Sequence, residues 1–312
     1  MAIGDLHEWA QLHGNWDLAS DSASYEGYES DKDDAGLLIA ADTHAITRGS
    51  ITATVNFEKE EPDSQARIVV GYEPEHEGYI AIGLGGHDAC LVVEEREPQY
   101  PHLLRIKVAG RAPTKTWPQT QRLTVHVKGR RLILMVNGAS VLATLLPRAL
   151  RSGEKVGLSA WGPRPVSFES IAIDREPPLV FVVMQFDGYE RLYEDVIRPL
   201  ESTLRLNLRR VDEVEHPGSI IADIEDGIAE ADLVIAEITE SNANVFYEVG
   251  FAYALSKPVV LIAKRSRKKL PFDLLVERCL FYEDSTEALP AVADALKGRV
   301  QAGLARTEWP ID

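Results

Sequence analysis

The sequence predicts two domains of different class, an all-β jelly-roll sandwich at residues 1–176 and an α/β domain at residues 177–312. Three observations support this division. Short runs of alternating apolar and polar residues fill the first half, strands and helices alternate in the second, and Pro177–Pro178 lies where the pattern changes. A chain of 312 residues is long enough to form two separate hydrophobic cores.

Alternation with a period of two is clearest in LTVHVKG, where Leu123, Val125 and Val127 are separated by polar residues. Comparable runs recur from residue 15 to 174, among them GSITATVNFE, ARIVVGYE, GYIAIGLG and KVGLSAWG. Turn residues separate the runs, and Asn137–Gly138 favours a type I′ hairpin. Many evenly spaced strands without a long helix are typical of a β-sandwich or jelly roll.

The second half begins with LVFVVMQF, a continuous apolar run typical of a strand that is covered on both faces. A helical stretch follows, with Leu192, Val196 and Leu200 spaced four residues apart. The remaining predicted elements are LRLNLRRV, SIIADIEDGIAEA (helix), DLVIAEIT, VFYEVGFAYALS (helix), PVVLIAK, CLFYE and TEALPAVADALKGRVQAG (helix). This alternation predicts a flavodoxin-like sheet of five parallel strands with right-handed crossovers.

The composition excludes several classes of protein. A net charge of -16 argues against binding to a nucleic-acid backbone or to an anionic membrane surface. Cys90 and Cys279 are too few for a disulfide framework, and no spacing typical of a metal site is present. The N-terminal residues lack the pattern of a signal peptide, and no run reaches the length of a membrane span. We expect a cytoplasmic protein without a metal or bound cofactor.

Ligands of an open parallel sheet bind at the carboxyl ends of its strands. The candidate binding residues at these ends are Phe186, Asp187, Gly188, Tyr189, Asp212, Thr239, Asn242, Asn244 and Tyr247. Each has a structural alternative. Gly188 suits any tight turn, and a capping role at the start of the following helix is an equal interpretation of Asn242 and Asn244. The basic run from Lys264 to Lys269 is interpreted as a solvated loop, with phosphate contact as the second choice.

Glu248 is the candidate catalytic residue. In a helix that starts near Asn244, it shares a face with Val245, Ala252 and Leu255, so a carboxylate interrupts an apolar stripe. Desolvation raises the pKa of such a group, while the helix N-terminus opposes the rise. A carboxylate there suits a nucleophile or a charge stabiliser for an oxocarbenium-like sugar centre. The structural alternative is a glutamate that favours the helix dipole or satisfies loop amides.

Three common motifs are absent: GxGxxG, GxxxxGK[ST] and GxSxG. The segments ADLVIAEITESNANVFYEVGFAYAL and VFVVMQFDGYERLYEDVIRPL instead resemble nucleoside 2-deoxyribosyltransferase-like and bacterial TIR-like domains, over residues 179 to about 300. The resemblance implies that Glu248 attacks or stabilises C1′ of a ribosyl group. This sequence departs from the family pattern in two places. Glu237 stands where aspartate is commoner, and the first strand ends in MQFDG rather than in the aromatic-Ile-Ser pattern of many TIR domains.

The first half resembles concanavalin A-like, laminin-G-like jelly rolls, on the segments RLTVHVKGRRLILMVNGASVLATLL and SGEKVGLSAWGPRPVSFESIAI. Many such domains bind glycans and some cleave them. The E-x-D-x-x-E signature of a catalytic pair is absent, and Trp117 and Trp161 suit core packing as well as sugar stacking. We interpret this half as a recognition or assembly module whose trigger is a glycan or a protein.

The leading hypothesis for function is an NAD-consuming glycohydrolase of the TIR-like kind, acting in bacterial antiviral defence. NAD would be its substrate, nicotinamide one product, and ADP-ribose or a cyclic compound the other. The resemblance implies that a neighbouring copy completes the site, so an active homo-oligomer is expected. Two alternatives remain: a nucleoside 2-deoxyribosyltransferase or nucleotide N-glycosidase, and a non-catalytic nucleotide-binding module joined to a lectin-like domain.

Overall fold

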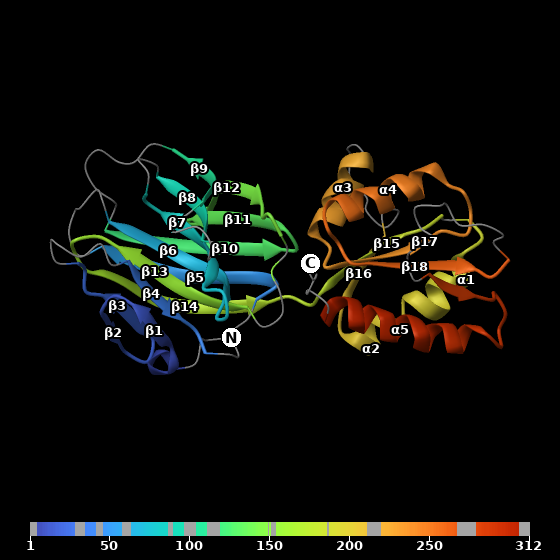
Figure 1. Ribbon diagram of the computed structural model, residues 1–312, viewed down its shortest axis with the longest axis horizontal. Coiled ribbons are helices and arrows are strands. Elements are labelled where there is room, and N and C mark those ends of the chain that lie inside the picture. Colours follow the sequence, from blue (N-terminus) through green and yellow to red (C-terminus); the bar gives the residue numbers. More distant parts are fainter. Residues whose placement is uncertain are drawn as a thin grey trace. The chain divides into compact units, whose positions relative to one another are not determined.

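The computed structural model describes residues 5–28, 35–41, 46–57, 64–86, 90–96, 104–110, 119–148, 150, 154–185, 187–210, 220–266 and 279–305. The chain divides into two compact units, Met1–Glu176 and Pro177–Asp312 (Figure 1). The boundary lies at the prolines where the hydrophobic pattern changes. No described helix combines the length and the apolar character that crossing a membrane requires.

The described strands of the first unit form two antiparallel sheets, preceded by a 3-10 turn, η1 (Leu6–Glu8). One sheet has the order β1 (Ala10–His13), β4 (Gly36–Ile39), β13 (Lys155–Trp161), β6 (Gln65–Glu73), β7 (Gly78–Leu84), β8 (Leu91–Arg96), β9 (Leu104–Ala109). The other has the order β12 (Ala139–Leu145), β11 (Arg131–Val136), β10 (Thr120–Lys128), β5 (Arg48–Phe57), β14 (Val166–Arg175), β3 (Ser22–Tyr25), β2 (Trp16–Leu18).

One hydrophobic core joins the two sheets. It contains Ile68 and Ile82 from the first sheet together with Leu123, Val125 and Phe168 from the second, all fully buried. Side chains that alternate along each strand therefore place every second residue in a shared interior, which is the packing of a β-sandwich. The predicted jelly-roll-like sandwich is confirmed.

The predicted hairpin at Asn137–Gly138 is also confirmed. It joins β11 to β12, with Val136 opposite Ala139 in the ladder. Asn137 has φ 50° and Gly138 has φ 83°, and a type I′ turn requires a positive φ at both central residues. Asparagine and glycine adopt this conformation more readily than other residues.

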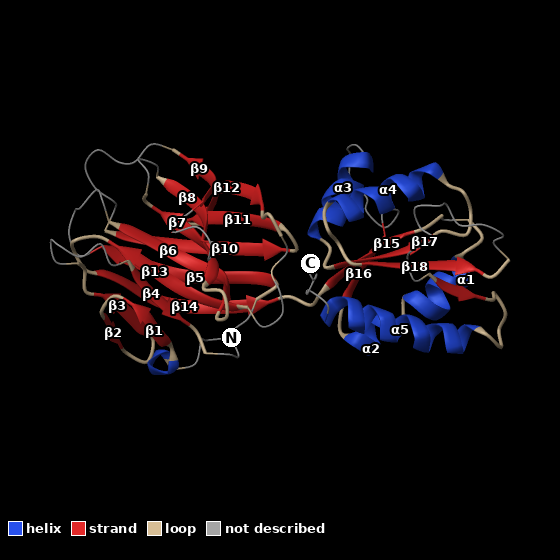
Figure 2. Ribbon diagram, viewed as in Figure 1, coloured by secondary structure: helices blue, strands red, loops and turns tan. Residues whose placement is uncertain are grey.

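The second unit contains a parallel sheet with the order β16 (Asn207–Arg210), β15 (Leu179–Val183), β17 (Leu233–Glu237), β18 (Val259–Lys264), β19 (Leu280–Tyr282). Numbered along the chain, this order is 2-1-3-4-5, that of flavodoxin-like sheets. Figure 2 shows α3 (Ile220–Glu230) and α4 (Ala243–Ala254) on one face of the sheet, with α2 (Leu200–Leu204) and α5 (Leu289–Ala305) on the other. Strand order reverses between β15 and β17, so their carboxyl ends flank the expected binding crevice.

The helical stretch after β15 differs from a single α-helix. It consists of α1 (Glu190–Leu192), a π-helical turn η2 (Tyr193–Ile197) and α2. The amide of Arg198 donates to the carbonyl of Tyr193 at 2.8 Å, and Pro199 follows without an amide proton. Because proline cannot donate the usual helical bond, the backbone widens by one residue just before it. Leu192, Val196 and Leu200 nevertheless all lie in the core, as their spacing predicts.

A close contact sets the position of α3 over β15. Gly227 of α3 lies so near the ring of Phe181 that an added β-carbon would approach the ring to 2.4 Å. Only glycine permits this separation. The contact therefore lets α3 pack closely against β15.

Candidate functional site

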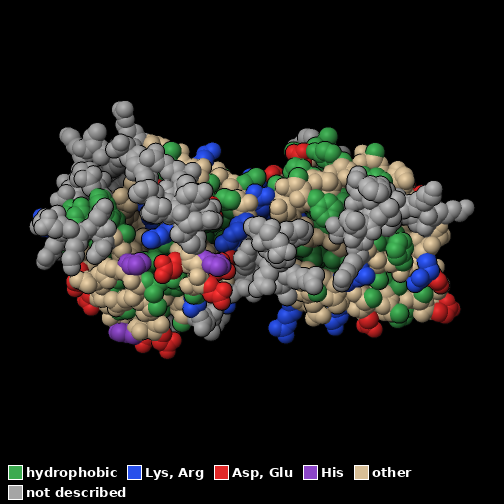
Figure 3. Space-filling view, in the orientation of Figure 1, with side chains coloured by type: hydrophobic (Ala, Val, Ile, Leu, Met, Phe, Trp, Pro, Cys, Tyr) green, Lys and Arg blue, Asp and Glu red, His purple; other side chains and the backbone are tan. Residues whose placement is uncertain are grey.

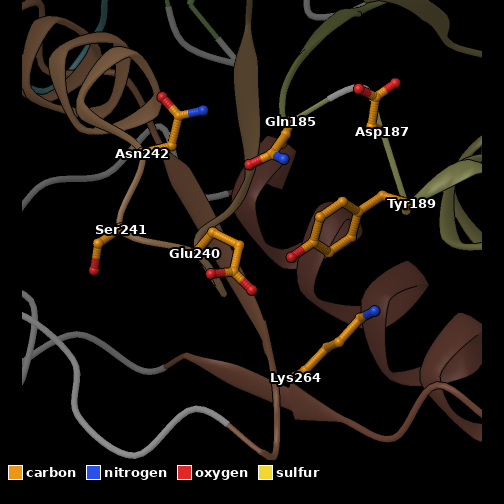
Figure 4. A pocket seen from close by; sticks show the side chains of 8 residues that line it. Gln185, Asp187, Tyr189, Glu240, Ser241, Asn242 and Lys264 are labelled. Atoms are coloured by element: carbon orange, nitrogen blue, oxygen red, sulfur yellow. The ribbon is translucent and has the colours of Figure 1, made fainter.

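A cavity of about 660 Å³ lies at the carboxyl edge of the parallel sheet, in the part of the chain that the structure describes. Three segments line it: the chain after β15, the chain after β17, and the last residue of β18. Figure 4 shows Gln185, Tyr189, Glu240 and Lys264 grouped near one another, and the lining residues are Gln185, Asp187, Gly188, Tyr189, Glu240, Ser241, Asn242 and Lys264. The cavity thus occupies the switch point that the strand order defines.

Asn242 joins the cavity to helix α4. Its side chain accepts a hydrogen bond from the amide of Asn244 at 2.9 Å and caps the helix. It also lines the cavity, so the capping role and ligand contact are compatible. Asn244 contributes its backbone amide to this cap, and its side chain is exposed.

Glu248 lies on the flank of α4. Val245, Val249 and Ala252 face the core, and the hydroxyl of Tyr247 lies 2.5 Å from Oε1 of Glu225 on α3. At about 100° per residue, Glu248 is placed between the core-facing stripe and the side that contacts α3. It lies six residues beyond Asn242, which is about 9 Å along the helix axis at 1.5 Å per residue.

The carboxylate of Glu248 is half-buried and makes no hydrogen bond or ion pair with the described residues. Burial raises its pKa from 4.5 to about 7. The rise follows the reasoning from sequence, in which desolvation by the apolar stripe opposes the helix dipole. A carboxyl group that ionises near neutral pH without a structural partner is a candidate for proton transfer or charge stabilisation.

A second carboxylate, Glu237, lies at the end of β17 and is 3% exposed. Oε2 accepts from the amide of Thr239 at 3.1 Å, and Oε1 accepts from the Thr239 hydroxyl and, at 3.3 Å, from the hydroxyl of Tyr282. Burial raises the pKa of Glu237, and these hydrogen bonds oppose the rise. Glu237 is therefore a buried acceptor for donors from two strands.

Tyr189 connects this buried group to the cavity. Burial raises the pKa of its phenol to about 12, the negative charge of Glu237 adds to the rise, and a hydrogen bond with Thr239 opposes it. The ammonium of Lys264 lies 4.7 Å from the centre of the Tyr189 ring and 2.9 Å from Oδ2 of Asp284. The first residue of the basic run is thus part of the cavity wall and is already paired with an acid.

The cavity contains four of the residues predicted from sequence: Asp187, Gly188, Tyr189 and Asn242. It excludes four others, Thr239, Asn244, Tyr247 and Glu248, from its lining. Phe186 and Asp212 lie outside the described residues. Within the described ranges, no three His, Cys, Asp or Glu side chains gather in a way that could hold a metal ion.

Four lining residues were not on the predicted list: Gln185, Glu240, Ser241 and Lys264. Gln185 directly follows the apolar run of β15, so its place in the sequence marks the end of that strand. Lys264 opens the basic run after the fourth strand of this domain, for which ligand contact was only the second choice because such residues are usually solvated.

No family model matches the chain, and a search of curated proteins finds no relative. Similar solved structures include the carbohydrate-binding module CBM66 from Bacillus subtilis, with 9% identity and a TM-score of 0.44 over 54% of this chain and 95% of that one. A putative glycosyl hydrolase from Parabacteroides distasonis has 11% identity and a TM-score of 0.35 over 55% of this chain and 89% of that one. The galectin LEC-6 from Caenorhabditis elegans has 10% identity and a TM-score of 0.32 over 48% of this chain and 95% of that one.

Proposed function

We propose that the second unit is an NAD glycohydrolase that cleaves the N-glycosidic bond to nicotinamide, with Glu248 at the reacting carbon. The observation that carries this proposal is the half-buried carboxylate of Glu248, which has no partner among the described residues and whose pKa is raised to about 7. A structural glutamate is ordinarily solvated or paired. Proteins keep such a costly arrangement mainly where function needs it.

The chemistry suits a single carboxylate. Cleavage of the bond leaves positive charge on C1′ of the ribosyl group, and an ionised Glu248 would stabilise that charge or form a covalent bond to the carbon. Nicotinamide is cationic within NAD and leaves as a neutral molecule, so its departure requires no proton donor. Water then adds to C1′ and loses a proton, which yields ADP-ribose. A neutral nucleoside would in addition need an acid to protonate its leaving base.

The size of a dinucleotide matches the layout of the site. The cavity offers hydrogen-bonding side chains to one half of the molecule, including Gln185, Ser241 and Asn242. Glu248 lies about 9 Å farther along α4, by the helical rise. A ligand with two ribosyl groups is long enough to fill the cavity and to bring its second ribosyl group to Glu248.

We further propose that the first unit recognises a glycan or protein trigger, or mediates assembly. The proposed role of the whole protein in bacterial antiviral defence rests on the family resemblance. Self-association is supported by apolar surface on the second unit. Ile221 of α3 is 59% exposed and Tyr247 of α4 is 51% exposed. Figure 3 shows hydrophobic side chains over this part of the unit. Exposed apolar side chains that gather on neighbouring helices favour contact with another protein surface.

The test is release of nicotinamide from NAD by the full-length protein, followed by chromatography. Glu248→Gln is expected to lower the rate by about 100-fold or more, because glutamine cannot carry the negative charge. Glu225→Gln is the matched control. It neutralises a half-buried carboxylate on the neighbouring helix and should leave the rate within about two-fold, as expected for a hydrogen bond away from the reacting atoms.

Each other outcome points to a different function. Wild-type turnover in Glu248→Gln would exclude this glutamate from the reaction. Exchange of bases between deoxynucleosides, without release of nicotinamide, would indicate a nucleoside 2-deoxyribosyltransferase. A nucleotide that raises the melting temperature of a protein without either activity would indicate a non-catalytic binding module.

A further inference from the structure

The cavity at the edge of the parallel sheet has an acidic lining. Asp187 and Glu240 contribute carboxylates. Gln185 and Asn242 add uncharged amides, and Lys264 is the only basic residue in the described part of the lining. The side chains that a ligand would meet there therefore carry more negative than positive charge.

The positive charge of Lys264 already has a partner. Its ammonium lies 2.9 Å from Oδ2 of Asp284, a residue outside the cavity lining. The same ammonium lies 4.7 Å from the centre of the Tyr189 ring. Because Asp284 neutralises Lys264, this lysine offers little net positive charge to an anionic ligand.

Glu240 is placed to meet a ligand in this cavity. It lies in the chain just after β17, which ends at Glu237. Its side chain is exposed, and Figure 4 shows it near Gln185 and Tyr189. Substitution of an exposed side chain leaves the core intact, so the role of Glu240 can be tested directly.

A carboxylate distinguishes a ribose hydroxyl from a phosphate. It accepts hydrogen bonds from hydroxyl donors, whereas a phosphate brings further negative charge to it. In dinucleotide-binding sheets, an acidic residue that accepts from the 2′-hydroxyl of the adenosine ribose favours NAD, and an arginine accommodates the 2′-phosphate of NADP. Two carboxylates and a neutralised lysine match the hydroxyl and not the phosphate.

We propose that Glu240 is a specificity-determining residue, which accepts a hydrogen bond from the adenosine ribose and, with Asp187, excludes the 2′-phosphate of NADP, so that the protein acts on NAD and not on NADP. This inference rests on the proposed function, in which the cavity holds one half of NAD and Glu248 acts at the ribosyl group of the other. NADP carries its additional phosphate on the adenosine ribose, in the half assigned to the cavity. The pyrophosphate is common to both dinucleotides and does not affect their comparison.

Binding of the two dinucleotides tests this selectivity. The full-length chain with Glu248→Gln, which should bind them without cleavage, is titrated by calorimetry with NAD and with NADP. NADP is expected to bind about 100-fold more weakly, because like charges placed together are strongly unfavourable. Adding Glu240→Gln should reduce this difference about 10-fold. It should leave NAD affinity within about three-fold, because the glutamine oxygen still accepts a hydrogen bond.

Glu194→Gln is the matched control. Glu194 lies on η2 outside the cavity lining, is 50% exposed and pairs with Arg198 at 2.8 Å. It removes the same charge from the same unit and should leave the ratio of the two affinities unchanged. Raising the salt concentration from about 0.05 M to about 0.5 M should narrow the difference between NAD and NADP, because salt screens exposed charges. A purely steric exclusion would not respond to salt.

Equal affinity for NAD and NADP would overturn the proposal, and so would a difference that neither Glu240→Gln nor salt reduces. If the wild-type protein still releases nicotinamide from NAD in either case, the proposed function stands. Selective binding of NAD without its cleavage by the wild-type protein would refute only the proposed function. A protein that binds neither dinucleotide would overturn both proposals.

Discussion

Replacement of Glu248 by glutamine is expected to stabilise the protein while it removes activity. Burial raises the pKa of Glu248 from 4.5 to about 7 in the folded state. The folded chain therefore binds a proton more tightly than the unfolded chain does. Stability from this group is fully present below about pH 4.5 and is lost as pH rises through about 7, where the folded protein must carry a half-buried charge.

The size of the effect follows from the same shift. At about 1.4 kcal/mol for each pH unit, the change from 4.5 to about 7 gives an upper limit of about 3 kcal/mol. Solvent screens a half-buried group, so the expected gain in Glu248→Gln at pH 8 is about 1–2 kcal/mol. The gain should shrink toward pH 4.5 and disappear below it, where the wild-type carboxyl is protonated in both states.

Urea unfolding of the two proteins at several pH values between 4.5 and 8, followed by circular dichroism, measures this difference. Glutamine resembles a protonated glutamate in shape, so the packing should be retained. A Glu248→Gln variant that is less stable than the wild type at pH 8 would refute the reasoning. That result would identify Glu248 as a helix-capping or amide-satisfying residue.

Three further predictions concern the whole protein. The rate of nicotinamide release should rise with pH and level off above about pH 7, because only ionised Glu248 stabilises a cationic sugar. Rates measured from pH 5 to 9 test this, and a flat profile would contradict it. A fragment of residues 177–312 should fold alone, because its two clusters of buried hydrophobic residues lie entirely within it. Circular dichroism of the expressed fragment tests this, and an unfolded or insoluble fragment would contradict it. Specific activity should increase with protein concentration, as mass action requires for an active homo-oligomer. Light scattering and nicotinamide release, measured on one dilution series, test this. A monomer that is equally active at every dilution and unaffected by deletion of residues 1–176 would refute it.

Local patterns in the sequence were enough to predict both fold classes. Alternation in β10 places Leu123, Val125 and Val127 in the core, as one buried face of a strand requires. The Asn137–Gly138 turn depends only on the conformational freedom of two adjacent residues. Continuous apolar strands between helices likewise imply a parallel sheet, because such strands must be covered on both faces.

Part of the cavity was also predictable, since the residues after a parallel strand collect at one edge of the sheet. Asp187, Tyr189 and Asn242 lie there for that reason. The raised pKa of Glu248 follows the same local logic, because its helix is apolar on both sides of it. Whether Glu248 borders the cavity depends on where α4 lies against α3, which spacing along one helix does not determine.

Only the tertiary structure shows that Tyr189, Glu237 and Tyr282 form a buried polar cluster. Tyr189, Glu237 and Tyr282 are distant in sequence, and each by itself has an ordinary structural role. They meet because parallel strands with crossover connections bring remote segments to one edge. Burial, pairing and charge are properties of neighbours in space, so the position of Lys264 on the Tyr189 ring and the partners of Glu237 follow from packing between strands, which no local pattern encodes.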